Sequence, residues 1–481
     1  MVEGTGSVLA GLPGLGGFEV VAVEREADGS RTVQVVSAPG TVCRCPGCGV
    51  ESERVHARDE HTVKHVVVAP LRVTWDKRRM TCGNGNCERR GTFVEDVSLA
   101  ARGGRVSLAG LDTMGHLIGD GVVAVSSVAD WGSVSWSTAH GGFIRLAEQA
   151  GIVVTGPAPT ADAEQVDAGE TDQAQVAVAG GGELAGEAAS DEETLSQLRS
   201  VVGPLPEVKV LGIDDQRRGS RRFHTDTTSG HWITDADCWN TVFIDSIGGH
   251  GLLGAAEGRA NAPVVAWILA QSEAWRAAIQ AVTIDMSPVY RSAVRAALPA
   301  ATLLVDLFQV AQLATNMLDD VRRRHTHRMR GRRRILDTLT ALAETDAEAA
   351  HEIRVAWKAR SLLFELLALA PSRTGLATSR TDVDRALHRF FDYCATFGKD
   401  IAELVTLAET IDSWRNEIAN AVLLGITNAA AEGVNRLTTL IYRVAFGLRN
   451  VANQLRRARS IASRSTRPGW LPRVTTHPHT A

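Results

Sequence analysis

Several features of exported and membrane proteins are missing from this sequence of 481 residues. No stretch approaches the roughly 18 consecutive apolar residues that a membrane-spanning helix needs, so we expect no such helix. The first residues lack a positively charged segment followed by an apolar core, so we also expect no signal peptide. Lysine is scarce, whereas Ala, Arg, Val and Gly are frequent, a composition associated with GC-rich bacterial genomes. We therefore expect a cytoplasmic bacterial protein.

Aromatic residues make up only 5% of the chain, and residues 155–200 contain none. This segment is rich in Ala, Gly and Gln, and it holds ten acidic residues against a single basic one, Arg199. Such a composition cannot bury enough apolar surface to fold, so we predict a flexible acidic linker over residues 155–203. The segment contributes −9 to the net charge of −4, which leaves +5 for the remainder. A modest positive charge on the folded parts is compatible with DNA binding.

Only seven cysteines are present, and four of them form two close pairs separated by 33 residues. Thiols in this pattern predict one tetrahedral structural Zn²⁺ site within an N-terminal module over residues 1–100. Its expected ligands are Cys45, Cys48, Cys82 and Cys87. A disulfide interpretation would need an oxidising compartment, which nothing in the sequence supports. Cys43 remains an alternative to Cys45, and His56 is a weaker competitor.

Residues 101–154 have a helical pattern that predicts a helix-turn-helix DNA-binding domain. In residues 123–138 the apolar positions fall at helical spacing, Gly132 lies near the turn, and Ser133 or Ser135 can cap the following helix. The second helix, Trp136–Gln149, is expected to enter the major groove. A plain helical pair that packs a core remains the alternative.

Acidic residues follow short apolar runs in the second half of the chain. Asp214 with Asp215, then Asp285, then Asp306 each stand at or just past such a run, which is how buried strands carry acids to the rim of a sheet. Three converging acids are the ligands of a two-metal site for phosphoryl transfer. The alternative is that each Asp only caps a strand end or a turn. Alternating strand and helix patterns predict an α/β sheet of mixed direction over residues 204–310, and residues 311–425 are helical in pattern.

A strongly basic segment lies within that helical region. Val321–Arg334 holds eight arginines and two histidines, a density suited to phosphate neutralisation, although a solvated helix face is the common alternative. The candidate DNA-binding residues are Arg322, Arg323, Arg324, Arg328, Arg330, Arg332, Arg333 and Arg334. Residues 451–481 are also basic, and we expect them to form a frayed tail.

These motifs together resemble a known family, the ISL-three insertion-sequence transposases, from about residue 40 to residue 450. The similarity rests on the cysteine motifs, on Gly212-Ile213-Asp214-Asp215, on Thr283-Ile284-Asp285-Met286, and on residues 428–435 followed by 443–447. The resemblance implies that Asp214, Asp285 and Glu432 form a triad binding two Mg²⁺ (or Mn²⁺) ions, with Asp215 and Asp306 accessory. Glu432 lies 147 residues after Asp285, which fits if the helical region is inserted before a segment over residues 426–450 that bears the third acid. Gln309 stands where the family usually has His.

The resemblance implies a multidomain α+β protein: a zinc-binding β module, a helix-turn-helix, and an RNase H-like catalytic domain of the DDE type with a large all-helical insertion. The expected function is a DNA transposase that binds terminal inverted repeats, cuts DNA with Mg²⁺ and transfers the strand. Its expected partners are transposon ends, target DNA and at least one further copy of the chain, with no membrane partner, in the bacterial nucleoid. Two alternatives remain, a catalytically impaired DNA-binding regulator and an RNase H-like nuclease of another DNA-processing system.

Overall fold

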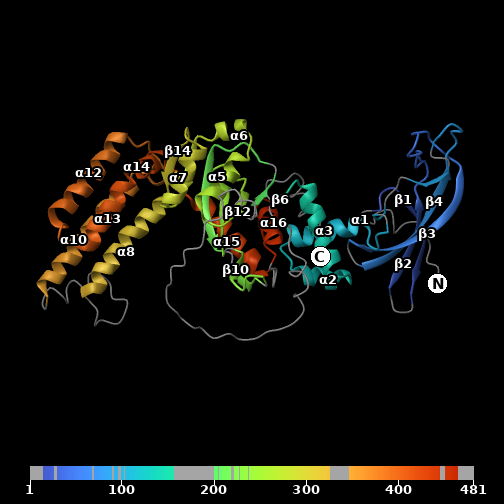
Figure 1. The fold of residues 1–481 in the computed structure, drawn as a ribbon, viewed down its shortest axis with the longest axis horizontal. Helices are drawn as coiled ribbons and strands as arrows, with labels where there is room; N and C mark the ends of the chain where they lie inside the picture. The colour runs from blue at the N-terminus through green and yellow to red at the C-terminus, as the bar shows by residue number, and fades with distance from the viewer. Residues whose placement is uncertain are drawn as a thin grey trace. The chain divides into compact units, whose positions relative to one another are not determined.

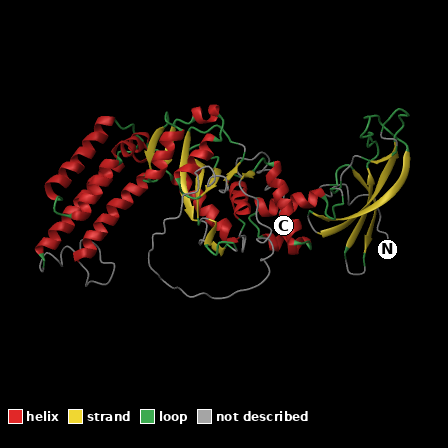
Figure 2. Ribbon diagram, viewed as in Figure 1, coloured by secondary structure: helices red, strands yellow, loops and turns green. Residues whose placement is uncertain are grey.

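The computed structural model describes residues 15–26, 30–67, 70–88, 91–95, 99–101, 103–155, 200–203, 205–217, 222–226, 228–236, 238–325, 346–444 and 450–463. Figure 1 traces the fold, and Figure 2 colours the same view by secondary structure. The chain divides into two compact units, Met1–Val153 with Arg443–Gly447, and Val154–Tyr442 with Leu448–Ala481. Among the described residues, no helix has the length and apolarity required to cross a membrane.

A five-stranded sheet dominates the first unit. Its strands are β1 (Phe18–Arg25), β2 (Arg31–Ser37), β3 (Val55–Val66), β4 (Pro70–Thr81) and β5 (Thr92–Val94). They lie in the order β1-β2-β4-β3, with β5 paired to β4. Alternate residues point to a small core that contains Val33, Val63, Val73 and Trp75, as expected for a sheet with one buried face. The four paired cysteines flank the long β3–β4 hairpin at its open end: Cys45 and Cys48 precede β3, and Cys82 and Cys87 follow β4.

Three helices complete the first unit: α1 (Leu108–Gly119), α2 (Val125–Gly132) and α3 (Trp136–Gln149). Helix α3 begins and ends at the residues predicted for it. The turn before it places Ser133 in the left-handed region (φ 48°), and the Ser135 hydroxyl accepts a hydrogen bond from the Thr138 backbone N–H (3.2 Å). Gly142 of α3 packs directly on the Leu111 carbonyl of α1, and a Cβ there would lie 2.5 Å from that oxygen.

A seven-stranded sheet organises the second unit. The strands follow the order β14-β13-β8-β11-β12-β7-β6, where β8 lies between β13 and β11 and is antiparallel to β11 but parallel to β13. Their bounds are β6 (Val153–Thr155), β7 (Ser200–Val202), β8 (Val210–Arg217), β11 (Trp239–Asp245), β12 (Leu252–Glu257), β13 (Ala281–Ile284) and β14 (Thr302–Val305). A separate hairpin of β9 (Arg222–Thr225) and β10 (Trp232–Ala236) stands between β8 and β11 in sequence. The predicted mixed sheet is therefore present, whereas most of the predicted acidic linker lies outside the described residues.

Short helices connect the strands: α5 (Asn261–Leu269), α6 (Glu273–Ala278) and α7 (Pro288–Ala297). Trp267 of α5 stacks on Phe243 of β11, with ring centroids 3.8 Å apart, over the position where β12 has Gly254. A Cβ at Gly254 would lie 2.4 Å from the Trp267 ring, so the glycine permits this close approach of helix and sheet.

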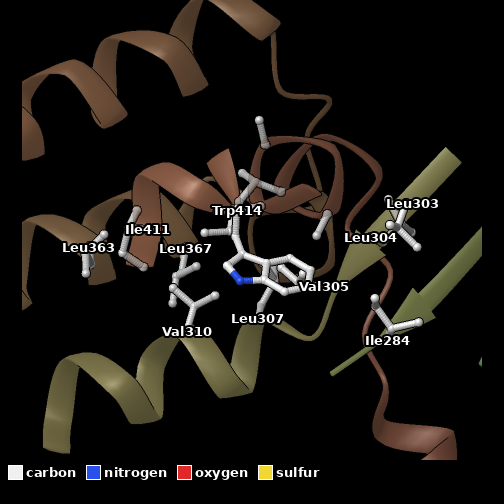
Figure 3. Packing of buried hydrophobic residues seen from close by; sticks show 14 of the residues in the cluster. Ile284, Leu303, Leu304, Val305, Leu307, Val310, Leu363, Leu367, Ile411 and Trp414 are labelled. Atoms are coloured by element: carbon white, nitrogen blue, oxygen red, sulfur yellow. The ribbon is translucent and has the colours of Figure 1, made fainter. Parts of the chain in front are cut away.

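Between residues 311 and 425 every described element of secondary structure is a helix, as the pattern predicts. The helices are α8 (Leu307–His325), α10 (Ala347–Ala368), α11 (Pro371–Thr374), α12 (Arg380–Phe397), α13 (Ala402–Ser413) and α14 (Arg415–Leu424). Their apolar faces continue the core of the sheet: Figure 3 shows Trp414 among side chains from α8, α10, α13 and β14. The carboxylate of Glu417 on α14, 5% exposed, accepts hydrogen bonds from Arg291 (3.1 Å) and Arg295 (2.9 Å) of α7. The helical region is therefore packed and ion-paired onto the end of the sheet.

The helices α15 (Ala429–Val444) and α16 (Val451–Ala462) follow. Helix α16 packs against β7 and β12, and its residues Leu455 and Ile461 are fully buried. The start of the predicted frayed tail is thus an ordered helix, because Val451, Leu455 and Ala458 form an apolar face at helical spacing. Residues after 463 lie outside the described part of the chain.

Candidate functional site

Three strands bring their acids to one edge of the large sheet. Ile213 of β8 pairs with Ile284 of β13, and Ile284 pairs with Val305 of β14, all in parallel register. The residues that follow are Asp214, Asp285 and Asp306, so this register places the three acids side by side. The backbone N–H of Asp306 donates to the Ile284 carbonyl (3.0 Å), which holds the last two together beyond the strands themselves.

Burial and mutual repulsion disfavour the charged forms of these acids. Burial, with the nearby Asp285 carboxylate, raises the pKa of Asp214 to about 7. Burial, with Asp306 and Asp215, raises the pKa of Asp285 to about 6, and burial also raises the pKa of Asp306. Ionised carboxylates in such a group repel one another, and a divalent cation among them would relieve that repulsion.

Helix α15 lies against the same edge. Glu432 is in its first turn, and the Asn435 side-chain amide, three residues later on the same face, donates to Asp214 Oδ2 (2.8 Å). The Gln216 amide of β8 donates in turn to the Asn435 carbonyl (3.2 Å). These contacts fasten the helix to the strand at Asp214.

Glu432 itself lies at the outer side of the group. Its negative charge contributes to the raised pKa of Asp306, so the two carboxylates are within electrostatic reach. Its side chain is 59% exposed and is hydrogen-bonded to Arg436, one turn further along α15. Glu432, the third acid of the predicted triad, is thus brought near the group, but its carboxylate is paired with Arg436.

Polar neighbours orient two of the other carboxylates. Asp306 accepts a hydrogen bond from the backbone N–H of Phe308 (3.1 Å). The backbone N–H of Asn428 and the side chain of Gln309 lower the pKa values of Asp306 and Asp285, respectively, against the effect of burial. Gln309 therefore occupies a contact that an imidazole could also make. Asn428 and Asn435 belonged to the motif on which the family resemblance rested, but no role was predicted for them. The spacing of three residues from Glu432 to Asn435 is the signal that points to a shared helix face.

Asp215 points to the opposite face of β8. It pairs across the strands with Thr241 of β11, whose hydroxyl is hydrogen-bonded to the Tyr290 hydroxyl (3.2 Å). Asp215 also accepts a hydrogen bond from Arg259 Nη1 (3.2 Å). It remains close enough to contribute to the raised pKa of Asp285.

The chemistry of this donor set fits a hard divalent cation. Mg²⁺ prefers carboxylate oxygens and usually keeps several waters. Asp214 and Asp285 contribute the most buried oxygens, and Glu432 could reach the group by releasing Arg436.

A second group of candidate ligands lies in the first unit. The Sγ atoms of Cys45, Cys48, Cys82 and Cys87 all lie within 4.8 Å of one another. Cys45 and Cys87 are 3.8 Å apart, and Cys48 and Cys82 are 3.6 Å apart. No disulfide links them, and four thiols at this spacing fit a tetrahedral Zn²⁺. The backbone N–H of Gly47 helps to lower the pKa of Cys45 to about 7, which favours the thiolate that binds the metal.

The alternative ligand Cys43 lies outside this group. It is buried, and its sulfur accepts a contact from Arg78 Nη2 (3.7 Å), whose guanidinium also pairs with Glu95 (2.8 Å). His56, the weaker competitor, is likewise not among the four. The structure therefore favours the predicted set with Cys45.

Three of the eight candidate DNA-binding arginines are described, and each is ion-paired. Arg322 pairs with Asp319 (3.2 Å), and Arg323 pairs with Asp320 (3.4 Å). Arg324 bridges Glu352 of α10 and Glu403 of α13, at 2.7 and 2.8 Å. Arg324 thus links helices, while Arg323, 70% exposed, remains accessible to a phosphate. The others, Arg328, Arg330, Arg332, Arg333 and Arg334, lie outside the described residues.

The fold and its acid-lined edge define an α/β protein with a candidate divalent-cation site. Residues 228–458 match a family model described as a transposase, the ISL3 type of DDE transposase. This match supports an ISL3-family transposase domain over these residues. The match includes Asp285, Asp306 and Glu432 and begins after Asp214. A search of curated proteins gave no match.

Proposed function

We propose that the protein is a DNA transposase that cuts at the terminal inverted repeats of an insertion sequence and transfers the freed strand to target DNA. The observation that carries the proposal is the meeting of Asp214, Asp285 and Asp306 at one sheet edge, with the helix of Glu432 packed against them. Raised pKa values there mark carboxylates that a divalent cation would stabilise in the ionised form.

The sheet topology supports an RNase H-like catalytic domain. Strands β8, β11 and β12 form an antiparallel meander, and β13 and β14 extend it in parallel on the other side of β8. This order places Asp214 on β8 and Asp285 at the end of β13, its parallel neighbour. The domain would begin near residue 204, with residues 311–425 inserted before the helix that bears Glu432.

Asp214, Asp285 and Glu432 would hold two Mg²⁺ or Mn²⁺ ions, which activate water and stabilise the attacking and leaving oxygens of an in-line displacement. Asn435 would orient Asp214, and Gln309 would orient Asp285. Asp306, already held by a backbone N–H group, would act as an accessory acid. Because cutting and strand transfer are both displacements at a phosphodiester, one such site would serve both.

The first unit would supply end recognition. The zinc module would order the β3–β4 hairpin, and α3 would enter the major groove with its exposed N-terminal residues. Within α3, His140 is buried against Trp136 and Arg145 pairs with Asp112 (3.1 Å), so Trp136, 42% exposed, and Ser137 are better placed for DNA. Paired transposon ends imply at least a dimer on DNA.

One observation favours a catalytically impaired regulator as the second candidate. Glu432 is exposed and paired with Arg436, so the third ligand must change partner before it can bind a cation. A regulator would bind the terminal repeats without cutting them.

Cleavage of a labelled duplex that carries the element's own end, with and without Mg²⁺, separates the candidates. We expect the wild type to cut at the end, Asp285→Ala to bind without cutting, and Asp384→Ala, an exposed acid on α12, to cut normally. Binding without cutting by all three proteins would favour the regulator, and equal cutting by all three would remove Asp285 from the site.

A further inference from the structure

Arg259 lies in the connection from β12 to α5 and pairs with Asp215, the residue that follows Asp214 in β8. Its guanidinium stacks over the Trp239 ring of β11, with Cζ 4.1 Å from the ring centroid. Its Nη1 donates to Asp215 Oδ2 of β8 at 3.2 Å. The side chain is 48% exposed, so one edge of the guanidinium faces solvent.

These two contacts fix the guanidinium but leave donors free. Stacking on Trp239 sets the plane, and the bond to Asp215 sets the rotation within that plane. Among the described residues, Asp215 is the only hydrogen-bond partner of this guanidinium. The guanidinium is planar, has unused N–H donors and is held by contacts with residues of two strands, β8 and β11. Such a group matches the bidentate geometry of a phosphate.

A purely structural ion pair is a poor explanation of this arrangement. Strands β8, β11 and β12 are already joined by backbone hydrogen bonds, so the pair between Arg259 and Asp215 is not needed to hold these strands together. Arg291 and Arg295 offer the contrast, because they bind the buried Glu417 and connect α7 with α14. Half-exposed ion pairs contribute little to stability because water screens them.

The negative charge of the neighbouring carboxylates suggests that Arg259 binds an anion. The carboxylates of Asp214, Asp285 and Asp306 repel a phosphodiester, and Asp215, on the other face of β8, is close enough to add to this charge; metal ions would neutralise only the group nearest the reaction. A fixed cation at the side of the acids would hold the neighbouring part of the strand.

We propose that Arg259 is a positioning residue that binds a backbone phosphate of the DNA strand next to the one being cut, with Trp239 as its platform. This inference rests on the proposed transposase function. Its chemistry is the recognition of one phosphodiester anion and involves no bond making or breaking.

The first test compares four proteins on the labelled end duplex: wild type, Arg259→Ala, Arg259→Lys and Arg385→Ala. Arg385 is an exposed arginine paired with Asp382 on α12, and it serves as the matched control. We expect Arg259→Ala to cut about 10–100-fold more slowly at saturating protein, and its slope of log binding constant against log salt to be smaller by about 1. Arg259→Lys should recover the salt slope but only part of the cutting rate, because an ammonium group lacks the planar fork.

A second test places the contacted phosphate. Single neutral methylphosphonates are introduced one at a time around the cut in the duplex. The wild type should lose cutting at one position beside the scissile phosphate, and Arg259→Ala should be insensitive at that same position. Wild-type cutting with an unchanged Arg259→Ala rate, salt slope and methylphosphonate profile would overturn the role of Arg259 alone. Absence of cutting by the wild type would overturn the transposase proposal and this inference with it.

Discussion

The two candidate metal sites of this chain differ in how closely the fold gathers their ligands. Four thiols close around one point in the first unit, whereas the described carboxylates that three strands bring to one sheet edge lie further apart than such a ligand group requires. Structural zinc sites are closed by protein ligands, and catalytic sites keep positions for water or substrate. We therefore propose a folding role for the thiols and a chemical role for the carboxylates.

The largest effect should come from opening the closed site. Cys48→Ser removes a zinc ligand, and a structural zinc contributes on the order of 10–16 kcal/mol to folding of its module. We expect native mass spectrometry to find one zinc in the wild type and none in the variant, with faster hydrogen exchange across residues 43–95. Cys238→Ser, at a half-buried thiol outside the cluster, should keep the metal. Retention of zinc by Cys48→Ser would contradict the four-thiol assignment.

The carboxylate site should respond differently to loss of a ligand. Asp285→Asn should lower Mg²⁺-dependent cutting by at least about 10³-fold, since a metal ligand is lost. In metal-free buffer at pH 8 the same change should raise the free energy of unfolding by about 1–2 kcal/mol, because it removes one buried, repelled charge. Thermal unfolding with EDTA measures this. A variant that is both inactive and less stable would indicate that Asp285 is structural.

Proton release should accompany metal binding at the carboxylates only below neutral pH. Asp214, with a folded pKa of about 7 against an ordinary value of 3.8 for an aspartate, holds its proton more tightly in the folded state. The wild type should therefore lose stability relative to Asp214→Asn as the pH rises from about 4 to about 7, and the difference should then stay constant. Mg²⁺ affinity, measured by calorimetry, should rise over the same range. A pH-independent affinity would contradict the raised pKa values.

A smaller effect is expected from the contact that orients the carboxylate site. Asn435→Ala removes the amide that donates to Asp214 and should slow cutting by about 10–100-fold while costing about 1 kcal/mol of stability. Asn420→Ala is the matched control, because that amide donates to the Leu303 carbonyl (3.3 Å). Equal cutting rates for the two variants would show that Asn435 only supports the fold.

Much of this arrangement could be predicted from the sequence because it is local. Apolar runs that end in Asp correctly located β8, β13 and β14, and cysteine spacing correctly indicated four close thiols. The choice between Cys43 and Cys45 was not local, because it depends on Arg78 and Glu95 from elsewhere in the sheet.

Other features depend on packing between segments far apart in sequence. Asn435 meets Asp214 across 221 residues, and Arg259 meets Asp215 across 44. Local patterns in one sequence cannot predict contacts between residues so far apart in the chain. The order of α16 was missed because its basic residues obscured the apolar face that packs on β7 and β12. The metal roles of Asp214, Asp285 and Glu432 stay predictions.

The most direct test of the central claim is the location of bound Mn²⁺ by anomalous diffraction from crystals of the protein with its end DNA. We predict manganese peaks that contact Asp214 and Asp285, with Glu432 released from Arg436 and bound to one of the ions. Manganese absent from this sheet edge, or held there without Asp214 and Asp285, would contradict the account.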